Sequence, residues 1–247
     1  MKPSFARLLA DAWAMLRHDA DLILRLAALL LFLPSFAVLL LCDPMPPLPA
    51  ERDPALIEAW MNAVGLWGQA NGGWYVLADA VGVLGSAAIA LLLVADARPT
   101  IGEALVEAGR RVLPFMLLTV LVAIPVGLGM WLFVLPGLYA QARLLTALPL
   151  LARDRGRTVP ETMACAWRQT RGQGYALTAA IVTLFLLQWL AIFPLLSADD
   201  WLRAPGHANP VVLSLVNAAI AAIGAAYHLG ALMIGVSSYR RLASSGT

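Results

Sequence analysis

The chain has 247 residues, of which 61% are hydrophobic and 13% are charged, and its formal net charge is +2. Soluble domains are roughly half apolar and about one quarter charged, so this composition excludes an ordinary soluble domain and indicates a membrane protein. The small net charge gives no indication of a nucleic-acid partner.

Six apolar runs are long enough to predict membrane spans, since a spanning helix needs about 20 residues. The first run follows an amphipathic stretch and has no small-x-small cleavage site after it, so we expect it to be retained and not removed as a secretion signal. We therefore expect a single all-α integral membrane domain over residues 1–247. The predicted spans are Leu22 to Cys42, Trp74 to Ala95, Val112 to Leu135, Leu138 to Ala152, Gly174 to Ser197 and Val211 to Val236.

Most of the 17 lysine and arginine residues lie in connections on one side of these spans. Because short cytoplasmic connections are rich in basic residues, we expect both termini to be cytoplasmic and the protein to lie in a bacterial inner membrane. The other side carries only Arg52 and Arg203. The residues on the cytoplasmic side are Lys2, Arg7 and Arg17, then Arg98, Arg110 and Arg111, then Arg153, Arg155, Arg157, Arg168 and Arg171, and finally Arg240 and Arg241.

The sequence contains a weak internal repeat of three copies, and each copy precedes a pair of spans. The matching stretches are SFARLLADAWAMLR from Ser4, TIGEALVEAGRRVLP from Thr100 and TVPETMACAWRQTR from Thr158. Ala12, Ala108 and Ala166 occupy equivalent positions in them. The repeat predicts three hairpin units, each preceded by a cytoplasmic amphipathic helix, over 1–96, 97–153 and 154–247. The alternative is convergence, because any helix that enters a membrane from the cytoplasm needs a cap and an apolar face.

Two of these stretches also contain a capping box. Thr100 is followed by Glu103, and Thr158 is followed by Glu161. In this motif the two side chains satisfy backbone N–H groups that have no partner inside the helix. Helices are therefore predicted to begin directly after Thr100 and Thr158.

Residues 43–73 form the one sizeable external segment. Its first part, DPMPPLPAERDP, is rich in proline and is predicted to be extended or turn-like. The second part places Ile57, Trp60, Val64 and Trp67 on one face of a helix. We expect this face to rest on the outer membrane surface or to cap the bundle, and a lid over a binding site is the alternative.

Proline and glycine organise the third and fourth spans. Pro136-Gly137 is predicted to form a tight turn between them, because Pro cannot extend a helix and Gly adopts the positive φ that a reversal needs. Pro125 is predicted to kink the third span in mid-membrane. Gly127 and Gly129 then allow another helix to approach closely.

A candidate polar site lies in the outer half of the spans. Arg143 and Asp79 both stand five residues into their spans from the external side, so equal depth makes them natural partners. Asn217 is at a similar level, and Gln141 is nearby. One interpretation is a site where Arg143 binds a lipid phosphate or a small anion. The other is a structural ion pair that sets helix register, since buried charges inside membranes usually pair.

From the third span into the fifth, the sequence resembles a known group. It is similar to the membrane domain attached to some bacterial glycerophosphoryl diester phosphodiesterases and to six-span inner-membrane proteins of the YciC type. The resemblance implies the six-span fold but little about activity, because the catalytic domain of those enzymes is separate and soluble. Family members commonly have Ser at the position of Ala166. The matching residues are Pro136-Gly137-Leu138-Tyr139, Arg143, Pro149 and Ala166-Trp167-x-x-Thr170-x-Gly172.

The sequence shows no catalytic or metal-binding constellation. We therefore expect a non-catalytic membrane protein without cofactor or metal, which binds lipid or a membrane partner and contributes to envelope organisation. The expected partners are membrane lipids, with a small anion or a protein as alternatives, and no nucleic acid. The second hypothesis is a small permease or exporter that uses the outer polar site.

Overall fold

The computed structural model describes residues 5–51, 53–95, 99–204 and 206–244, which form helices and connections without a strand. Lys2, Ser4, Arg52 and Arg98, which entered the predictions above, lie outside these ranges. In chain order the elements are α1 (Phe5–His18), α2 (Ala20–Ala27), a π-helical turn (Ala28–Phe32), α3 (Leu33–Leu41), α4 (Pro54–Val94), α5 (Ile101–Arg110), α6 (Val112–Leu132), α7 (Val134–Leu144), α8 (Ala147–Arg153), α9 (Val159–Gln169), a 3-10 turn (Thr170–Gly172), α10 (Gly174–Arg203) and α11 (Pro210–Ser244).

Six helical stretches in the described part of the chain are long and apolar enough to cross a membrane. Each of them overlaps one predicted span, so the prediction of a multi-pass membrane protein is confirmed at this level. Their bounds are Ala20–Leu41, Pro54–Val94, Val112–Leu132, Val134–Arg153, Gly174–Arg203 and Pro210–Ala243.

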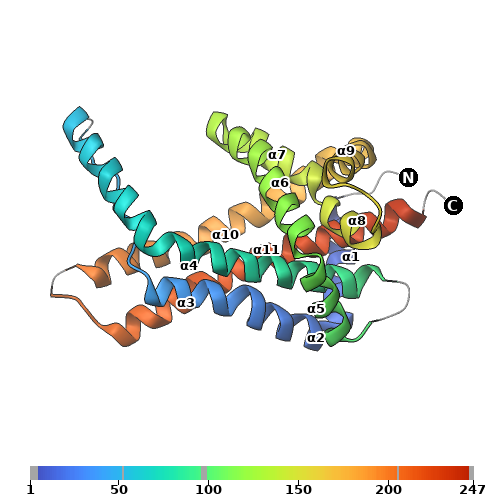
Figure 1. The fold of residues 1–247 in the computed structure, drawn as a ribbon, viewed down its shortest axis with the longest axis horizontal. Coiled ribbons are helices and arrows are strands. Elements are labelled where there is room, and N and C mark those ends of the chain that lie inside the picture. Colours follow the sequence, from blue (N-terminus) through green and yellow to red (C-terminus); the bar gives the residue numbers. More distant parts are fainter. Residues whose placement is uncertain (1–4, 52, 96–98, 205, 245–247) are drawn as a thin grey trace.

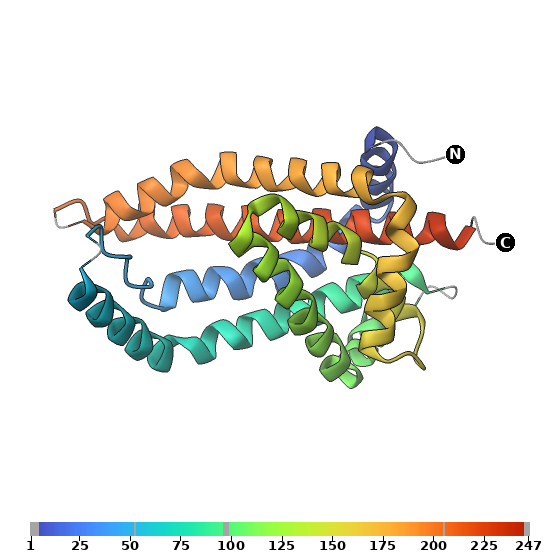
Figure 2. The same cartoon turned by 90° about the horizontal axis from the view of Figure 1, so that it is seen from above.

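Most of the long helices lie lengthwise in one bundle, formed by α3, the second half of α4, α10 and α11 (Figures 1 and 2). One end of the bundle, here called the proximal end, carries α1, α5, α8, α9 and the last turns of α11. The distal end carries the end of α3, the end of α10 and the start of α11. The α6–α7 pair does not follow the bundle and rises from it at a steep angle.

The core is concentrated toward the proximal end. All residues of α11 from Ala231 to Ser238 are buried, which means that other elements surround this helix on every side. In α4, the run from Ala87 to Leu91 is buried as well. Small residues at such contacts let helix backbones approach closely and increase van der Waals contact, which is how helices associate in lipid.

The three repeated stretches form helices α1, α5 and α9, and the same two positions of each are buried. One position is filled by Leu8, Ala104 and Thr162, and the next, four residues later, by Ala12, Ala108 and Ala166. Residues four apart lie on one face of a helix. Each stretch therefore packs through an equivalent face, while the division of the chain into three repeated hairpin units stays a prediction.

Both predicted capping boxes are formed. The backbone N–H of Thr100 donates to Glu103 at 2.8 Å, and the N–H of Glu103 donates to the Thr100 hydroxyl oxygen at 3.3 Å. The N–H of Thr158 donates to Glu161 at 3.0 Å. The helix starts at Ile101 and Val159 are those that the sequence predicts.

The first span is interrupted by the π-helical turn between α2 and α3. Pro34 follows this turn, and a proline has no N–H to donate to the carbonyl four residues earlier, which here is that of Leu30. A wider turn accommodates such a missing hydrogen bond. α4 packs closely at this point, because a Cβ atom added to Gly85 would lie 2.6 Å from Cβ of Leu30.

Helix α4 joins the helix predicted in residues 43–73 to the predicted second span, because α4 runs without interruption from Pro54 to Val94. The external position of residues 43–73 stays a prediction. At 1.5 Å per residue its 41 residues extend over roughly 60 Å, about twice the thickness of a bilayer core. Figure 1 shows that α4 bends along its length, and its sequence contains the pair Gly72-Gly73, a type of sequence at which helices bend.

The face of α4 predicted from the sequence contacts the preceding extended segment. The indole N–H of Trp60 donates to the carbonyl of Pro46 at 3.0 Å, and that of Trp67 donates to the carbonyl of Asp43 at 2.8 Å. Ile57, like these two tryptophans, is half-buried. The tryptophans therefore attach the extended segment to the first half of α4.

The predicted turn at Pro136-Gly137 is wrong. α6 ends at Leu132 and α7 begins at Val134, so the chain reverses at the extended residue Phe133, with φ −158° and ψ 148°. Pro136 is the third residue of α7, where a backbone N–H has no intrahelical partner, so the proline removes no hydrogen bond. The expected kink at Pro125, which lies inside α6, stays a prediction.

Gly137 serves close packing and not chain reversal. A Cβ atom on Gly129 would lie 2.6 Å from the backbone nitrogen of Gly137, and one on Gly137 would lie 2.6 Å from the backbone nitrogen of Met130. The backbones of α6 and α7 therefore touch near their connection. Gly127, predicted to act in the same way, has no such neighbour within 4 Å.

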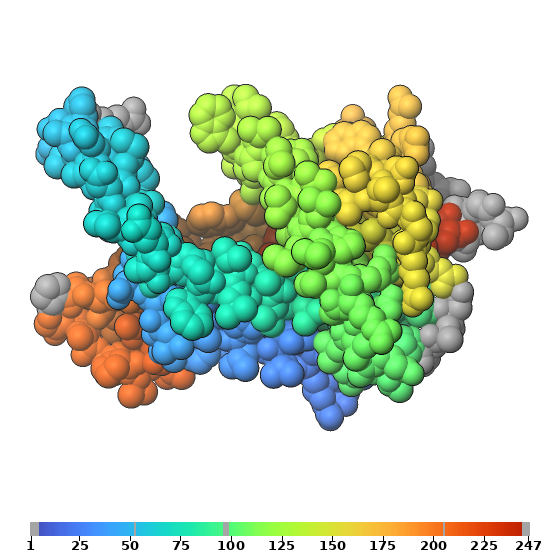
Figure 3. Space-filling view, viewed as in Figure 1, coloured from blue at the N-terminus to red at the C-terminus, as the bar shows by residue number. Residues whose placement is uncertain are grey.

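In Figure 3 the end of the α6–α7 hairpin and the first half of α4 both stand out from the body of the molecule, with a hollow between them.

The fourth span is also interrupted, between α7 and α8. Pro149 cannot donate to the carbonyl of Leu145, four residues earlier, and the two helices are separated by Leu145 and Thr146. α11 packs against this break, because a Cβ atom on Gly235 would lie 2.5 Å from the carbonyl oxygen of Leu145. The break thus forms part of the proximal core.

Candidate functional site

Several arginines at the proximal end bind the carbonyl ends of helices other than their own. At the end of α4, the Leu93 carbonyl accepts from Nε of Arg240 at 3.1 Å and also from its Nη2. The carbonyl of Val94 accepts from Arg153 at 3.4 Å. The last carbonyls of a helix lack intrahelical partners and carry partial negative charge, so these two cations stabilise the end of α4.

Arg111 does the same for α8. It follows α5, and its guanidinium donates to the carbonyl of Leu151 at 2.6 Å and to that of Ala152 at 3.3 Å. The guanidinium also lies over the ring of Phe115, 5.3 Å from its centroid. Burial lowers the pKa of Arg111, while the nearby Glu107 raises it. Arginine pKa values lie so high that this group stays charged at physiological pH.

Arg143 occupies a third position of this kind, at the last turns of α9. It is 5% exposed. Its Nη2 donates to the carbonyl of Trp167, its Nε to the hydroxyl of Thr170 at 2.9 Å, and its Nη1 to the hydroxyl of Tyr139 at 2.6 Å. The guanidinium carbon lies 4.4 Å from the ring centroid of Trp167, in cation–π contact. Gly174, the first residue of α10, leaves room for the side chain, since a Cβ atom there would lie 3.2 Å from Cδ of Arg143.

The predicted ion pair between Arg143 and Asp79 is not formed. The donors of Arg143 point to α9 and the 3-10 turn, whereas Asp79 lies exposed on α4. Counting residues gives a depth along each helix but not the direction in which a side chain points. The tilt of the α6–α7 hairpin adds a second error, because depth along a tilted helix is not depth in the bundle.

Gln141 and Asn217 are also drawn into separate contacts. Gln141 accepts a hydrogen bond from the hydroxyl of Tyr227 at 3.0 Å, which links α7 to α11. Asn217 is 2% exposed and donates to the carbonyl of Leu39 at 3.1 Å, which links α11 to α3. The structure therefore does not bring the four predicted residues into one site, and each of these two joins a different pair of helices.

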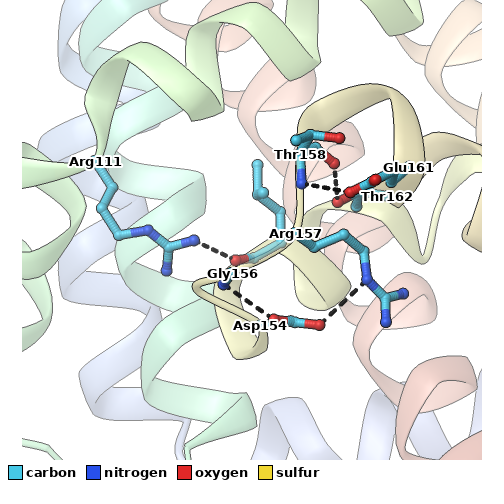
Figure 4. Close-up of polar contacts among 8 residues, drawn as sticks. Arg111, Asp154, Gly156, Arg157, Thr158, Glu161 and Thr162 are labelled. Atoms are coloured by element: carbon cyan, nitrogen blue, oxygen red, sulfur yellow. Dashed lines mark hydrogen bonds and ion pairs between the residues drawn. The ribbon is translucent and has the colours of Figure 1, made fainter.

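The connection between α8 and α9 is held in a defined shape (Figure 4). The carboxylate of Asp154 accepts from the backbone N–H of Gly156 at 3.1 Å and pairs with Nε of Arg157 at 3.2 Å. The capping box of Thr158 and Glu161 follows directly. These contacts hold the connection that carries Arg155 and Arg157.

A cavity of about 570 Å³ lies beside this connection. Arg153, Arg155 and Arg157 line it, together with the single acid Asp154. Apolar side chains, including Leu150 of α8, form the rest of the wall with Gln169 and Tyr239. We call this space the proximal cavity.

A second cavity, of about 600 Å³, lies between the end of α4 and α5. Its lining includes Leu91 and Val106 as well as Glu107, Arg110 and Arg155. Arg155 lines both cavities, and its guanidinium lies 3.2 Å from Glu107. Both spaces therefore combine arginine with apolar side chains. In the described part of the chain, no three His, Cys, Asp or Glu side chains are grouped so as to hold a metal ion.

The capping role of Arg111, Arg153 and Arg240 was not predicted from the sequence. In the sequence, these three arginines were used only as basic residues that indicate orientation. Each of these arginines stands at or near the end of a predicted span, and that position could be seen in the sequence. Which carbonyl each one reaches depends on how the helices pack, so the partners were not visible.

Comparisons with known proteins add no assignment to this geometry. No family model matches the chain, and neither a curated protein nor a solved structure shows significant similarity to it.

Proposed function

We propose that the protein is a non-catalytic integral membrane protein that binds lipid and contributes to envelope organisation. Its place is the bacterial inner membrane, with both termini in the cytoplasm, so that the proximal end is the cytoplasmic end. Six long apolar helices support the membrane part of this proposal, and the basic residues of the connections support the orientation. The resemblance to YciC-type membrane domains belongs to the same proposal.

The observation that carries lipid binding is the lining of the two cavities at the proximal end. Both combine arginine side chains with apolar ones. A phospholipid presents the same combination, an anionic headgroup joined to apolar chains. Clusters of basic residues at the cytoplasmic ends of spans attract anionic headgroups.

The contacts of the intramembrane polar residues support a structural role for them. Arg143, Gln141 and Asn217 each join a different set of helices through hydrogen bonds. Polar side chains commonly hold membrane helices together in this way.

One observation favours the alternative, a small permease or exporter. The hydroxyl oxygens of Thr146 and Ser238 are buried and have no hydrogen-bond partner in the structure. Buried polar groups normally have a partner, so these two atoms are available to a polar substrate or to water inside the proximal core.

Native mass spectrometry of the protein extracted with its surrounding lipid tests the proposal. We expect retained phospholipid, and the same bound species after Arg143→Leu at matched folding, because that guanidinium is already engaged by protein groups. Retained phospholipid that disappears with Arg143→Leu would instead place the lipid site at Arg143. Substrate flux in proteoliposomes that is lost with Thr146→Val, without retained lipid, would support the permease.

A further inference from the structure

We propose that the proximal cavity is a binding site for the phosphate group of an anionic phospholipid headgroup. This inference rests on the proposed function and names the chemistry of its ligand. The cavity volume of about 570 Å³ falls within the range of small-molecule sites, about 300–1,000 Å³. That space accommodates a phosphate with the glycerol groups on either side of it.

The charges that line the cavity favour an anion. The lining contains three arginines and one carboxylate, that of Asp154. A guanidinium has five N–H donors in a planar fork that matches phosphate oxygens in pairs. Arg157 contacts Asp154 through Nε, and Arg155 contacts Glu107 through Nη2. Those contacts leave the two Nη groups of Arg157 and the Nε and Nη1 of Arg155 to bind phosphate.

Contacts within the protein hold the connection that carries these arginines. The carboxylate of Asp154 binds the backbone N–H of Gly156 and the guanidinium of Arg157. The next residue, Thr158, is the N-cap of α9 and forms its capping box with Glu161. A site whose ligating groups are already held in place loses less conformational entropy when the ligand arrives.

The apolar part of the wall indicates a lipid as the source of the phosphate. Leu150 of α8 and Leu242 of α11 belong to the lining. Both helices belong to stretches long and apolar enough to cross a membrane, so the cavity lies where these stretches end. Leu242 is half-buried and Ala243 is exposed, so a lipid whose headgroup is bound here contacts these side chains with the first groups of its chains, and a free phosphate ion makes no such contact.

The test uses the full-length protein in lipid nanodiscs of phosphatidylcholine with a minor fraction of phosphatidylglycerol. Native mass spectrometry after release counts the phosphatidylglycerol that stays bound. The double variant Arg155→Gln with Arg157→Gln removes two charges that line the cavity. The matched control, Arg168→Gln with Arg171→Gln, removes two exposed charges that do not line it. A third variant, Ala243→Trp, fills the cavity without changing the charge.

We call the variant with Arg155→Gln and Arg157→Gln the cavity pair and the variant with Arg168→Gln and Arg171→Gln the control pair. We expect the cavity pair to retain phosphatidylglycerol about tenfold more weakly than the control pair. Ala243→Trp is expected to weaken retention as well, although its charge is unchanged. Equal losses in the two arginine pairs would overturn the proposal, because general surface attraction would then explain the binding. So would full retention in the cavity pair.

A second arm separates the two sources of phosphate. Inorganic phosphate at about millimolar concentration is expected to leave phosphatidylglycerol bound, because the ion makes none of the apolar contacts. Binding of inorganic phosphate alone, abolished by the cavity pair, would assign the site to a free anion and overturn the lipid part of the proposal. If lipid is retained equally by every variant, this inference fails while the proposed lipid-binding function stands. If no variant and no original protein retains lipid, the proposed function fails.

Discussion

The proximal and distal ends of this bundle are held together in different ways. At the proximal end, α11 is buried on all sides from Ala231 to Ser238, and arginines bind the carbonyl ends of three helices. At the distal end, the contact between Asn217 and Leu39 is a single hydrogen bond between helices. Apolar side chains away from the proximal core stay exposed, among them Trp131, which is 87% exposed near the end of α6.

The difference follows from what stabilises helices in a membrane. Exposed apolar side chains cost little in lipid, so the hydrophobic effect does not drive spanning helices together. Close packing and hydrogen bonds remain, and here both are concentrated at the proximal end. Helix-end carbonyls also need partners, and arginines that reach over from neighbouring helices supply them. Substitutions at the two ends are therefore expected to differ in effect.

The largest effect is expected for Gly235→Ala. The new Cβ atom would lie 2.5 Å from a backbone carbonyl oxygen, which cannot move without displacing the α7–α8 break. We expect a loss of about 2 to 3 kcal/mol of stability, measured by thermal unfolding in detergent. The matched control is Gly224→Ala in the same helix, where nothing lies within 4 Å. Alanine favours a helix over glycine by about 1 kcal/mol, so the control should be neutral or stabilising. Equal losses would refute a tightly packed proximal core.

Arg143→Leu is expected to come next. It removes the guanidinium donor from the hydroxyl of Tyr139 and from the carbonyl of Trp167, which keeps only a bond of 3.3 Å from the hydroxyl of Thr170, and we expect a loss of about 2 kcal/mol. Arg143→Lys keeps the charge but not the planar fork, so we expect an intermediate loss. Arg168→Gln, an exposed change on α9, should stay within about 0.5 kcal/mol. Adding Asp79→Leu should not recover the stability that Arg143→Leu loses. A recovery in the double variant would instead support the predicted ion pair between Arg143 and Asp79.

Asn217→Leu tests the distal end. It removes the single hydrogen bond to Leu39, and bonds of this type between membrane helices contribute about 0.6 kcal/mol on average. Ser214→Ala removes a bond within α11 itself, to the carbonyl of Pro210, and should change stability by only a few tenths of a kcal/mol by the same reasoning. A loss for Asn217→Leu as large as that for Gly235→Ala would contradict the comparison between the two ends.

The smallest effect concerns the starts of α5 and α9 at low pH. Hydrogen bonds from the backbone of Thr100 and Thr158 lower the pKa values of Glu103 and Glu161 below their ordinary value of 4.5. Their contribution is therefore present above that value and lost as the pH falls through the lower folded-state pKa. As the pH falls through this range, amide hydrogen exchange in the first turns of both helices, corrected for intrinsic rates, should become faster.

The variant Glu103→Gln provides the control for this effect. Glutamine also forms a capping box but does not titrate. The pH dependence should disappear in α5 and persist in α9. Exchange at the two helix starts that does not change with pH would show that the carboxylates contribute nothing.

The parts of the structure that were predicted correctly depend on neighbouring residues. The capping boxes at Thr100 and Thr158 each involve residues three apart, and both formed. Ala12, Ala108 and Ala166 were aligned from the sequence, and the structure shows that all three are buried. The wrong predictions have two different origins. Arg143 was assigned a partner by depth alone, and Pro136-Gly137 was assigned a turn from residue type alone.

The sequence by itself determined that the chain forms six apolar helices and where two of the short helices begin, because those properties depend on composition and on contacts within one helical turn. Only the tertiary structure decided the partners of Arg143, Asn217 and Gln141. Successive side chains point about 100° apart around a helix. Which neighbour a side chain reaches is therefore decided only when the other helices are in place. The proximal cavity has the same origin, since its wall is built from α8, α9 and α11, which the chain brings together only in the folded bundle.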